Sequence, residues 1–356
     1  MKVAILAPSK SIHTHKWALY YKNKGIEVKV YTLPLHYSET NANEVDTEII
    51  GKQLPGKISY FTAVPHLKKK LKEFRPTVLH AHFVSSYGLI GALANYQPLF
   101  ISVWGKDIFD FPLKNKLNQK LIEFTLSKAD QIGSTSHVMA KVTSQYTDKK
   151  IEVTPFGVDL NKFYPSSQES STKITIGTVK ALEDKYGIGD LINAFHLFHK
   201  EFPDSKLVIA GDGPQKEEYI QLAKKLEIAD ATTFTGRVPN DEVPNLIREF
   251  SIFAVPSTQD SESFGVAAVE SMACGVPVVV SNVGGLPEVV VDGVTGIVVE
   301  KNNPQMLAKA FCDLAASPEL RESIGASGVL HVKKHYNWTD NADDMIKLYN
   351  KYTEKR

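Results

Sequence analysis

Short apolar runs alternate with amphipathic stretches along most of the chain, and this alternation limits the possible folds more than any other feature. In the first half, the apolar runs predict strands at Val3–Ala7, Glu27–Tyr31, Val78–Ala81, Leu99–Val103 and Gln131–Ser134. The stretches between them predict helices at Trp17–Lys24, Leu67–Phe74, Ser86–Asn95, Leu117–Lys128 and Val138–Thr143. Strands that alternate with helices form a parallel sheet covered on both faces, because each parallel connection needs a crossover.

A polar, serine-rich segment, Tyr164–Thr172, interrupts the alternation and predicts a linker. Beyond it, apolar runs predict further strands at Ile174–Gly177, Leu207–Ala210, Thr232–Thr235, Ile252–Val255, Val278–Val280 and Gly296–Val299. A chain of 356 residues is long enough for two cores. We therefore expect an α/β protein with two doubly wound, Rossmann-like domains, at 1–165 and 166–335, that face each other across a cleft. Pro34–Gly56 is polar and predicts no regular structure.

Composition favours a soluble protein of a reducing compartment. The chain is 43% apolar and 23% charged, and no apolar run approaches the roughly 18 residues that span a bilayer. The apolar run that starts at Met1 is too short for a secretory signal and is typical of a buried strand. Two cysteines, Cys274 and Cys312, cannot form a disulfide framework, so we expect a cytoplasmic location.

The two halves carry opposite charge. Residues 1–165 hold 22 Lys and Arg against 13 Asp and Glu, whereas residues 166–356 hold 19 against 27. The basic residues gather in His66–Arg75 and at Lys114, Lys116 and Lys120. They predict either an ordinary solvated helix surface or contact with an anionic membrane, which is worth about 1 kcal/mol per basic residue. Nucleic acid is not expected as a partner, because no recognition module or aromatic platform accompanies the lysines.

Two carboxylates frame the segment Glu262-Ser-Phe-Gly-Val-Ala-Ala-Val-Glu270, which follows one predicted strand and precedes another. We expect Glu262 just before a helix and Glu270 two turns further in, about 12 Å along the axis. The free N–H groups of Phe264, Gly265 and Val266 would form an anion site. This spacing suits a nucleoside diphosphate with a sugar at one end and a ribose at the other. The alternative is ordinary helix decoration, which is weaker for Glu270 because its helix is otherwise apolar.

This segment resembles the Glu-x7-Glu signature of the retaining glycosyltransferases of family 4, which have the GT-B fold. Other motifs of that family follow in the expected order across residues 150–300. They are similar at Val153–Phe163, Gly177–Phe195, Leu207–Pro214, Phe234–Val238, Ser281–Glu288 and Gly293–Ile297. In the second of these, Tyr186 separates Lys185 from the glycine that usually follows the family's lysine.

The resemblance implies roles for residues of the second domain. Lys185 would neutralise the departing diphosphate with Lys180, which stands where the family usually has arginine. Glu262 would bind hydroxyls of the donor sugar, Glu270 the ribose, and the backbone at Arg237 and Val238 the base. The motif around Gly211 belongs to the same donor site. The departing phosphate would act as base, and neither a cofactor nor a metal is expected; the donor would carry UDP rather than GDP.

The first domain departs from the family pattern. Where the family often has a Gly-Gly turn, the loop reads Pro8–His15, and Trp104 replaces a histidine near the reacting carbon. His13, Trp104 and Asp107 are candidates for the acceptor side. The pairs His13-Thr-His15 and His80-Ala-His82 have metal-ligand spacings, but ordinary strand or loop histidines explain them more simply. GT-B proteins also lead us to expect that 336–356 forms a helix packed back on the first domain.

The favoured function is retaining transfer of a sugar from a nucleoside diphosphate to a saccharide acceptor. A lipid-linked acceptor in cell-surface polysaccharide synthesis would place the enzyme at the inner membrane face. The alternatives are a soluble small-molecule acceptor, a sugar-nucleotide epimerase, and a non-catalytic nucleotide-sugar-binding subunit. A dehydrogenase is disfavoured, since no Gly-x-Gly-x-x-Gly follows the first strand.

Overall fold

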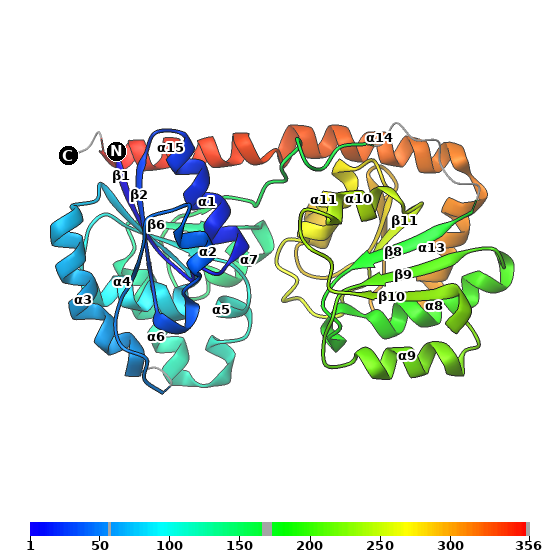
Figure 1. Ribbon diagram of the computed structural model, residues 1–356, viewed down its shortest axis with the longest axis horizontal. Coiled ribbons are helices and arrows are strands. Elements are labelled where there is room, and N and C mark those ends of the chain that lie inside the picture. Colours follow the sequence, from blue (N-terminus) through cyan, green and yellow to red (C-terminus); the bar gives the residue numbers. More distant parts are fainter. Residues whose placement is uncertain (56–57, 166–172, 354–356) are drawn as a thin grey trace. The chain divides into compact units, whose positions relative to one another are not determined.

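The computed structural model describes residues 1–55, 58–165 and 173–353, and it divides the chain into two compact units (Figure 1). Unit 1 is Met1–Pro155 with Ala342–Arg356, and unit 2 is Phe156–Asn341. The boundary precedes the predicted residue 165, because the backbone at Val158 exchanges hydrogen bonds of 2.8 and 3.0 Å with Tyr336 and Trp338 of unit 2. Most of the predicted linker, at 166–172, lies outside the described residues, as do Gly56 and 354–356.

Unit 1 contains a seven-stranded parallel sheet with the order β3-β2-β1-β4-β5-β6-β7. Its strands are β1 (Lys2–Leu6), β2 (Glu27–Thr32), β3 (Thr47–Ile49), β4 (Val78–His82), β5 (Leu99–Val103), β6 (Gln131–Ser134) and β7 (Ile151–Val153). The predicted strands are present to within one residue, but β3 and β7 were not predicted. Both are edge strands of three residues that are only partly buried, so neither produces an apolar run.

Four of the five helices predicted for unit 1 begin earlier than their sequence pattern indicates, whereas the helix predicted at Ser86–Asn95 begins later, at Leu89, after a short turn. They are α1 (Ile12–Asn23), α2 (Glu39–Ala42), α3 (Ile58–Phe74), α4 (Leu89–Ala94), α5 (Lys106–Phe109), α6 (Lys116–Lys128) and α7 (His137–Thr143), with short turns η1 (Pro34–His36), η2 (Phe83–Gly88) and η3 (Pro112–Lys114). The Ser11 side chain accepts the Thr14 N–H and so starts α1 before Trp17. Proline usually marks a first helical turn, but Pro65 lies inside α3. The segment predicted as irregular contains η1, α2 and β3.

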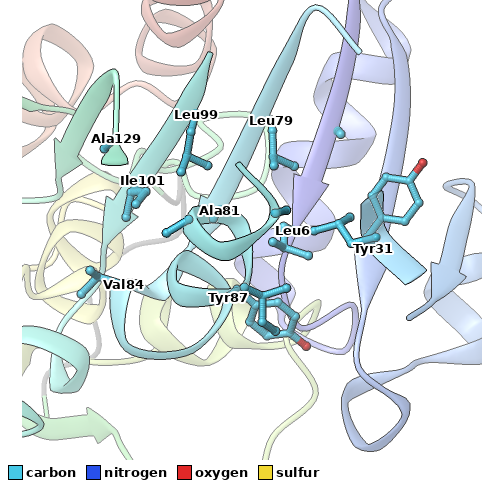
Figure 2. Close-up of a cluster of buried hydrophobic side chains, with 14 of the residues drawn as sticks. Leu6, Tyr31, Leu79, Ala81, Val84, Tyr87, Leu99, Ile101 and Ala129 are labelled. Atoms are coloured by element: carbon cyan, nitrogen blue, oxygen red, sulfur yellow. The ribbon is translucent and has the colours of Figure 1, made fainter. Parts of the chain in front are cut away.

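One apolar layer of unit 1 lies between the sheet and the helices of one face, and buried side chains of the same strands form a second layer on the other face. Figure 2 shows Leu6, Leu79, Ala81, Leu99 and Ile101 pointing from three adjacent strands of this sheet, β1, β4 and β5, toward the same apolar layer. The helix α15 (Trp338–Thr353) begins in unit 2 and ends in unit 1. Within unit 1 its fully buried Tyr349 hydroxyl lies 3.2 Å from that of Tyr21 and 2.5 Å from His80 Nδ1.

Unit 2 contains a six-stranded parallel sheet with the order β10-β9-β8-β11-β12-β13. Its strands are β8 (Thr175–Val179), β9 (Lys206–Ala210), β10 (Thr232–Gly236), β11 (Ile252–Val255), β12 (Val278–Ser281) and β13 (Gly296–Val299). Its helices are α8 (Ile188–Glu201), α9 (Lys216–Lys225), α10 (Val243–Arg248), α11 (Val266–Ala273), α12 (Leu286–Val289), α13 (Pro304–Ala316) and α14 (Pro318–His335), with turns η4 (Asp184–Tyr186) and η5 (Ala229–Ala231). Helices α8 and α9 cover one face, and α10 and α11 the other (Figure 1). The predicted pair of doubly wound parallel sheets is confirmed.

In both sheets the strand order reverses at the first strand of the unit, which is β1 in unit 1 and β8 in unit 2. Loops that leave the carboxyl ends on either side of such a point diverge to opposite faces and leave a crevice for ligands. The carboxyl ends beside β1 and β8 are therefore where functional side chains are expected.

Candidate functional site

The predicted donor residues of unit 2 come from loops at one edge of its sheet. Lys180 follows β8 directly, Gly211 follows β9 and Arg237 follows β10, while Glu262 lies in the loop after β11. All of these strands are parallel, so their carboxyl ends share this edge. The structure thus brings together residues that are up to 82 positions apart in sequence.

A largely buried ion pair at this edge joins Lys180 to Glu262. The Lys180 Nζ lies 2.8 Å from Glu262 Oε2, which also accepts a 3.1 Å hydrogen bond from Ser257 Oγ. The two charged side chains are only 13% and 10% exposed. Burial alone would raise the pKa of Glu262, but Lys180, Ser257 and the charge of Lys185 outweigh it and lower that pKa. Glu262 is therefore held ionised as an acceptor-only group.

Lys185 lies at the same edge, where its side chain and that of Lys180 both contact the ring of Tyr186. The Nζ of Lys185 lies 4.5 Å from the centre of the Tyr186 ring, and the Nζ of Lys180 lies 4.8 Å from it. The carbonyl of Lys185 accepts the Thr258 N–H at 2.8 Å, which ties its loop to the loop after β11. Glu183 lies 3.3 Å from Lys185 Nζ. One aromatic ring therefore positions both candidate phosphate-binding cations.

Gly211 is required where the loops after β8 and β9 meet. Its φ is +146°, and a Cβ at this position would lie 1.8 Å from the carbonyl oxygen of Lys180. Its N–H donates to the carbonyl of Gly236 at 2.8 Å, which places Arg237 and Val238 beside this turn. Arg237 is exposed and Val238 is half-buried. The predicted base-binding segment therefore borders the Lys180 loop.

The helix between the two framing carboxylates is shorter than predicted. Helix α11 begins at Val266, so Glu262 lies in the preceding loop and the predicted separation of 12 Å along one axis is wrong. Gly265 has a φ of +87°, which a side chain would strain, and it starts the helix. Within the part of the chain that the structure describes, the N–H groups of Phe264, Gly265 and Val266 donate to no other group. Glu270 is half-buried on a helix that is otherwise almost wholly buried.

Aromatic rings gather at the equivalent edge of unit 1. Trp104, directly after β5, lies 4.2 Å from His82 at the end of β4, 4.9 Å from Phe83 and 6.1 Å from His13 on α1, measured between ring centres. Phe83 has a φ of +69°, a strained conformation that often marks functional sites. Of these residues, the sequence predicted His13 and Trp104 and placed His82 among ordinary histidines.

Asp107 supports the loop that carries Trp104. Its carboxylate accepts N–H groups from Val84 at 2.8 Å, Trp104 at 3.2 Å and Gly105 at 2.9 Å, and it is 5% exposed. Burial raises the pKa of Asp107, although these backbone hydrogen bonds oppose the rise. Asp107 therefore acts as a positioning residue for Trp104 and η2.

The histidines at this edge are neutral near pH 7. Burial lowers the pKa of His80 to about 3, and burial with the nearby Lys16 lowers the pKa of His13 to about 4. Burial, together with His80 and His13, holds the pKa of His82 well below its ordinary value. The Nδ1 of His82 lies 3.3 Å from Thr14 Oγ1, and His80 Nε2 lies 2.8 Å from Ser102 Oγ. These histidines thus offer uncharged rings at this edge, beside the hydroxyls of Thr14 and Ser102.

Two kinds of feature are absent from the part of the chain that the structure describes. Among residues 1–55, 58–165 and 173–353, no group of three or more His, Cys, Asp and Glu side chains is arranged to hold a metal ion. No helix in these same ranges combines the length and apolar character needed to cross a lipid bilayer.

Sequence reasoning missed Ser257, Tyr186 and His82. Ser257 and Tyr186 act through contacts with residues of other loops, which no local pattern shows. A signal for His82 did exist: His80 and His82 alternate along β4, as Phe100, Ser102 and Trp104 alternate from β5, and alternate residues share a face of a sheet.

Comparisons with known proteins agree with this geometry. A family model described as Glycosyl transferases group 1 matches residues 161–331, and one described as Glycosyl transferase 4-like matches residues 2–136. The chain is 26% identical to a D-inositol 3-phosphate glycosyltransferase of Segniliparus rotundus, over 98% of this chain and 88% of that one. It is also 26% identical to a GDP-mannose-dependent alpha-(1-6)-phosphatidylinositol monomannoside mannosyltransferase of Mycolicibacterium smegmatis, over 76% and 77% of the two chains.

A solved structure with a similar fold is that of Anabaena HepE in complex with UDP. The two structures have a TM-score of 0.85 at 18% sequence identity, and the similarity covers 99% of this chain and 100% of HepE. At this identity, the likeness establishes the fold alone.

Proposed function

The chain belongs to the group 1 glycosyl transferases, which transfer a sugar from a nucleotide sugar and have the GT-B fold, and from this premise we propose a specific reaction. The enzyme moves a sugar from a UDP-sugar to a saccharide acceptor, with retention of configuration at the anomeric carbon. The observation that carries the proposal is the Lys180–Glu262–Ser257 contact beside Lys185, at the carboxyl ends of β8 and β11.

In this reaction the cations act on the leaving group. The bond from the anomeric carbon to the diphosphate oxygen breaks, and negative charge builds on that oxygen. Lys185 and Lys180, held against Tyr186, stabilise this charge, which supports a reaction without a metal. The acceptor oxygen attacks the same face, and its proton passes to the departing phosphate oxygen, so no protein base is required.

Other groups of unit 2 hold the rest of the donor. Glu262 accepts hydrogen bonds from hydroxyls of the sugar, for which its lowered pKa suits it. The N–H groups of Phe264, Gly265 and Val266 bind phosphate oxygens, since the start of a helix favours anions. Glu270 accepts from the ribose hydroxyls, and the backbone of Arg237 and Val238 contacts the base. UDP is the nucleotide bound by HepE, which shares the fold, and the GDP-mannose-dependent relative makes GDP the competing choice.

For unit 1 we propose the acceptor. A tryptophan face suits a sugar ring, which offers apolar C–H groups for stacking, and Trp104 with His13 provides such a surface. A lipid-linked acceptor at the cytoplasmic face of the membrane fits the basic character of residues 1–165. Two free cysteines, Cys274 and Cys312, fit a reducing compartment.

A thermal-shift screen against UDP, GDP, ADP and their common sugar conjugates tests the donor. A nucleotide present at 100 times its Kd should stabilise the folded protein by about 2.7 kcal/mol, which raises Tm. Stabilisation by UDP and UDP-sugars is expected, and NMR of the product should show the anomeric configuration of the donor. Selective stabilisation by GDP would overturn the choice of nucleotide. No stabilisation by any nucleotide would favour a non-catalytic subunit.

A further inference from the structure

Unit 1 exposes large apolar side chains on the turn η3 and the helix α6. Leu113 is 77% exposed, Leu117 is 67% exposed and Phe124 is 39% exposed. Folding normally leaves such side chains exposed singly, and a group of them on one element marks an interaction surface. These three lie within 12 residues of chain, on one turn and the helix that follows it.

Lysines surround these apolar side chains. Lys114, Lys116, Lys120 and Lys128 are all exposed. Within residues 1–55, 58–165 and 173–353, none of the four forms an ion pair. The acidic residue of α6 is Glu123, which accepts a hydrogen bond from Gln119 at 2.9 Å. We call these seven residues the η3–α6 surface: Leu113, Lys114, Lys116, Leu117, Lys120, Phe124 and Lys128.

The exposure of Leu113 is built into the fold. Pro112 is buried, and the Asn115 side chain accepts the Asn118 N–H at 2.9 Å, which starts α6. The buried Asn118 side chain donates to the carbonyl of Phe111 at 3.1 Å and so ties η3 to the helix. The turn is therefore held by its own polar contacts, and Leu113 points away from the core that it could otherwise join.

The η3–α6 surface begins at the edge of the sheet that carries Trp104. The chain leaves β5 at Trp104, continues through α5 and η3, and returns along α6 to the start of β6. Because β5 and β6 are parallel, α6 begins near the carboxyl edge and ends near the opposite one. Its 13 residues span roughly 20 Å at 1.5 Å per residue, about the height of the sheet.

We propose that the η3–α6 surface docks the enzyme on a membrane whose headgroups are anionic, with Leu113 and Leu117 inserted among the lipids. This inference rests on the proposed function, since a lipid-linked acceptor would then lie near Trp104. Lysines without acidic partners match anionic headgroups, and leucines that protrude this far suit a fluid interface better than a flat protein surface.

The lysines of α3 are less suited to this role. Lys70 lies 2.7 Å from Glu48 and 3.5 Å from Glu73, and Lys69 lies 4.0 Å from Glu73. Their charge is partly neutralised within unit 1, although His66–Arg75 is the densest basic stretch of the sequence. The structure therefore favours α6 over α3 as the membrane-facing element.

Sedimentation with vesicles tests the proposal. The vesicles contain phosphatidylcholine, with or without phosphatidylglycerol, and the full chain should bind only those with phosphatidylglycerol. Changing Lys114, Lys116 and Lys120 to Gln should lower the partition coefficient on the order of 100-fold, because each lysine near an anionic surface contributes about a fivefold factor. Changing Leu113 and Leu117 to Ser should lower it roughly tenfold or more.

Matched controls lie in unit 2. Lys224, Lys225 and Lys301, which are exposed, changed to Gln remove the same charge, and Val294→Ser replaces an apolar side chain that is 52% exposed. Both should leave vesicle binding unchanged, as should Lys68→Gln with Lys69→Gln on α3. Equal losses in the controls and in the η3–α6 variants would overturn the proposal. Unchanged binding in the leucine variant, or binding of RNA in place of vesicles, would do so as well.

The stabilisation of each variant by UDP separates this inference from the proposed function. The altered side chains are exposed, so Tm and the shift produced by UDP should match those of the unaltered chain. If the η3–α6 variants show the normal Tm shift with UDP and bind vesicles as well as the unaltered chain, the η3–α6 surface is not the membrane-binding surface, and the proposed donor site is unaffected. If UDP does not raise the Tm of the unaltered chain, the proposed function itself is contradicted.

Discussion

The two sheets reverse their strand order in the same way, yet the corresponding edges carry different kinds of side chain. In unit 2, charged side chains meet beside β8: Lys180 and Glu262 form an ion pair, and Lys185 shares the Tyr186 ring with Lys180. In unit 1, the edge beside β1 and β4 presents His13, a neutral His82 and Trp104. The strand order supplies a place for ligands, and the side chains select the ligand.

The difference matches the two substrates that we propose. A diphosphate carries charge that increases as the sugar leaves, so cations at its site lower the barrier. A sugar ring carries no charge, and a tryptophan beside neutral histidines can bind it without an ionic partner. The two buried carboxylates also differ in role. Glu262 is an ionised side chain of the donor site, whereas the carboxylate oxygens of Asp107 accept hydrogen bonds from backbone N–H groups.

The largest expected effect is that of Lys185→Ala. Loss of this cation should lower kcat by roughly 10²- to 10³-fold, because the charge that it stabilises develops only in the transition state. The KM for the donor should change much less. Steady-state kinetics with a UDP-sugar measure both values. Lys224→Ala is the control, since Lys224 is an exposed lysine of the same unit on helix α9. Equal activity in the two variants would refute the role of Lys185.

Glu270→Gln should weaken nucleotide binding roughly 10- to 100-fold, because hydrogen bonds to a charged acceptor contribute about 1.5–3 kcal/mol. Turnover at saturating donor should fall less than for Lys185→Ala. Calorimetric titration with UDP gives the affinity, and Glu322→Gln on the exposed face of α14 is the control. Unaltered affinity would show that Glu270 is not the ribose acceptor and that unit 2 binds the nucleotide otherwise.

Much of this comparison could be predicted from the sequence. Strands buried on both faces appear as nearly continuous apolar runs, which is why β5 and β11 were placed to the residue. The glycosyltransferase motifs identified the family, which the matching family models confirm. The motifs also indicated that their residues lie close together, because the motifs follow strand ends and the carboxyl ends of parallel strands meet at one edge.

The remainder could not be predicted, because it depends on contacts between distant segments. Nothing in the local sequence of Lys180 shows that its partner is Glu262, or that Tyr186 lies against both lysines. Edge strands such as β3 lack a fully buried face and so carry no apolar run. Trp104 could be found from the family pattern, but its ring contact with His82 requires the register of β4 against β5.

Trp104→Ala should raise the KM for the acceptor about tenfold, since a stacked ring contributes on the order of 1 kcal/mol beyond the area that it buries. The affinity for UDP should not change. Trp104→Phe keeps an aromatic face and should restore most of the loss. Because His13 and His82 stay neutral, the acceptor KM should also vary little between pH 6 and 8, where an ordinary histidine would titrate. A tenfold loss of UDP affinity in Trp104→Ala would contradict the assignment of the acceptor to the edge of unit 1 and of the donor to the edge of unit 2.

The smallest expected effect is a change in the pH dependence of stability when Lys180 is replaced by Met. In the unaltered chain the pKa of Glu262 is below its ordinary value, so its ionisation stabilises the folded state above the ordinary pKa of 4.5, and this contribution is lost as pH falls through the lowered value. In Lys180→Met, burial dominates and raises that pKa, so stability is lost as pH rises instead.

The difference in Tm between the unaltered chain and Lys180→Met should therefore increase as pH rises through 4.5. Thermal unfolding followed from acid to neutral pH measures it. Introducing Glu262→Gln into both proteins should remove the pH dependence of the difference, because the titrating group is gone. No comparable effect is expected at the edge of unit 1, where His82 is already neutral. A constant difference with Glu262 present would mean that Lys180 does not hold Glu262 ionised, and the charged character of the unit 2 edge would then rest on Lys185 alone.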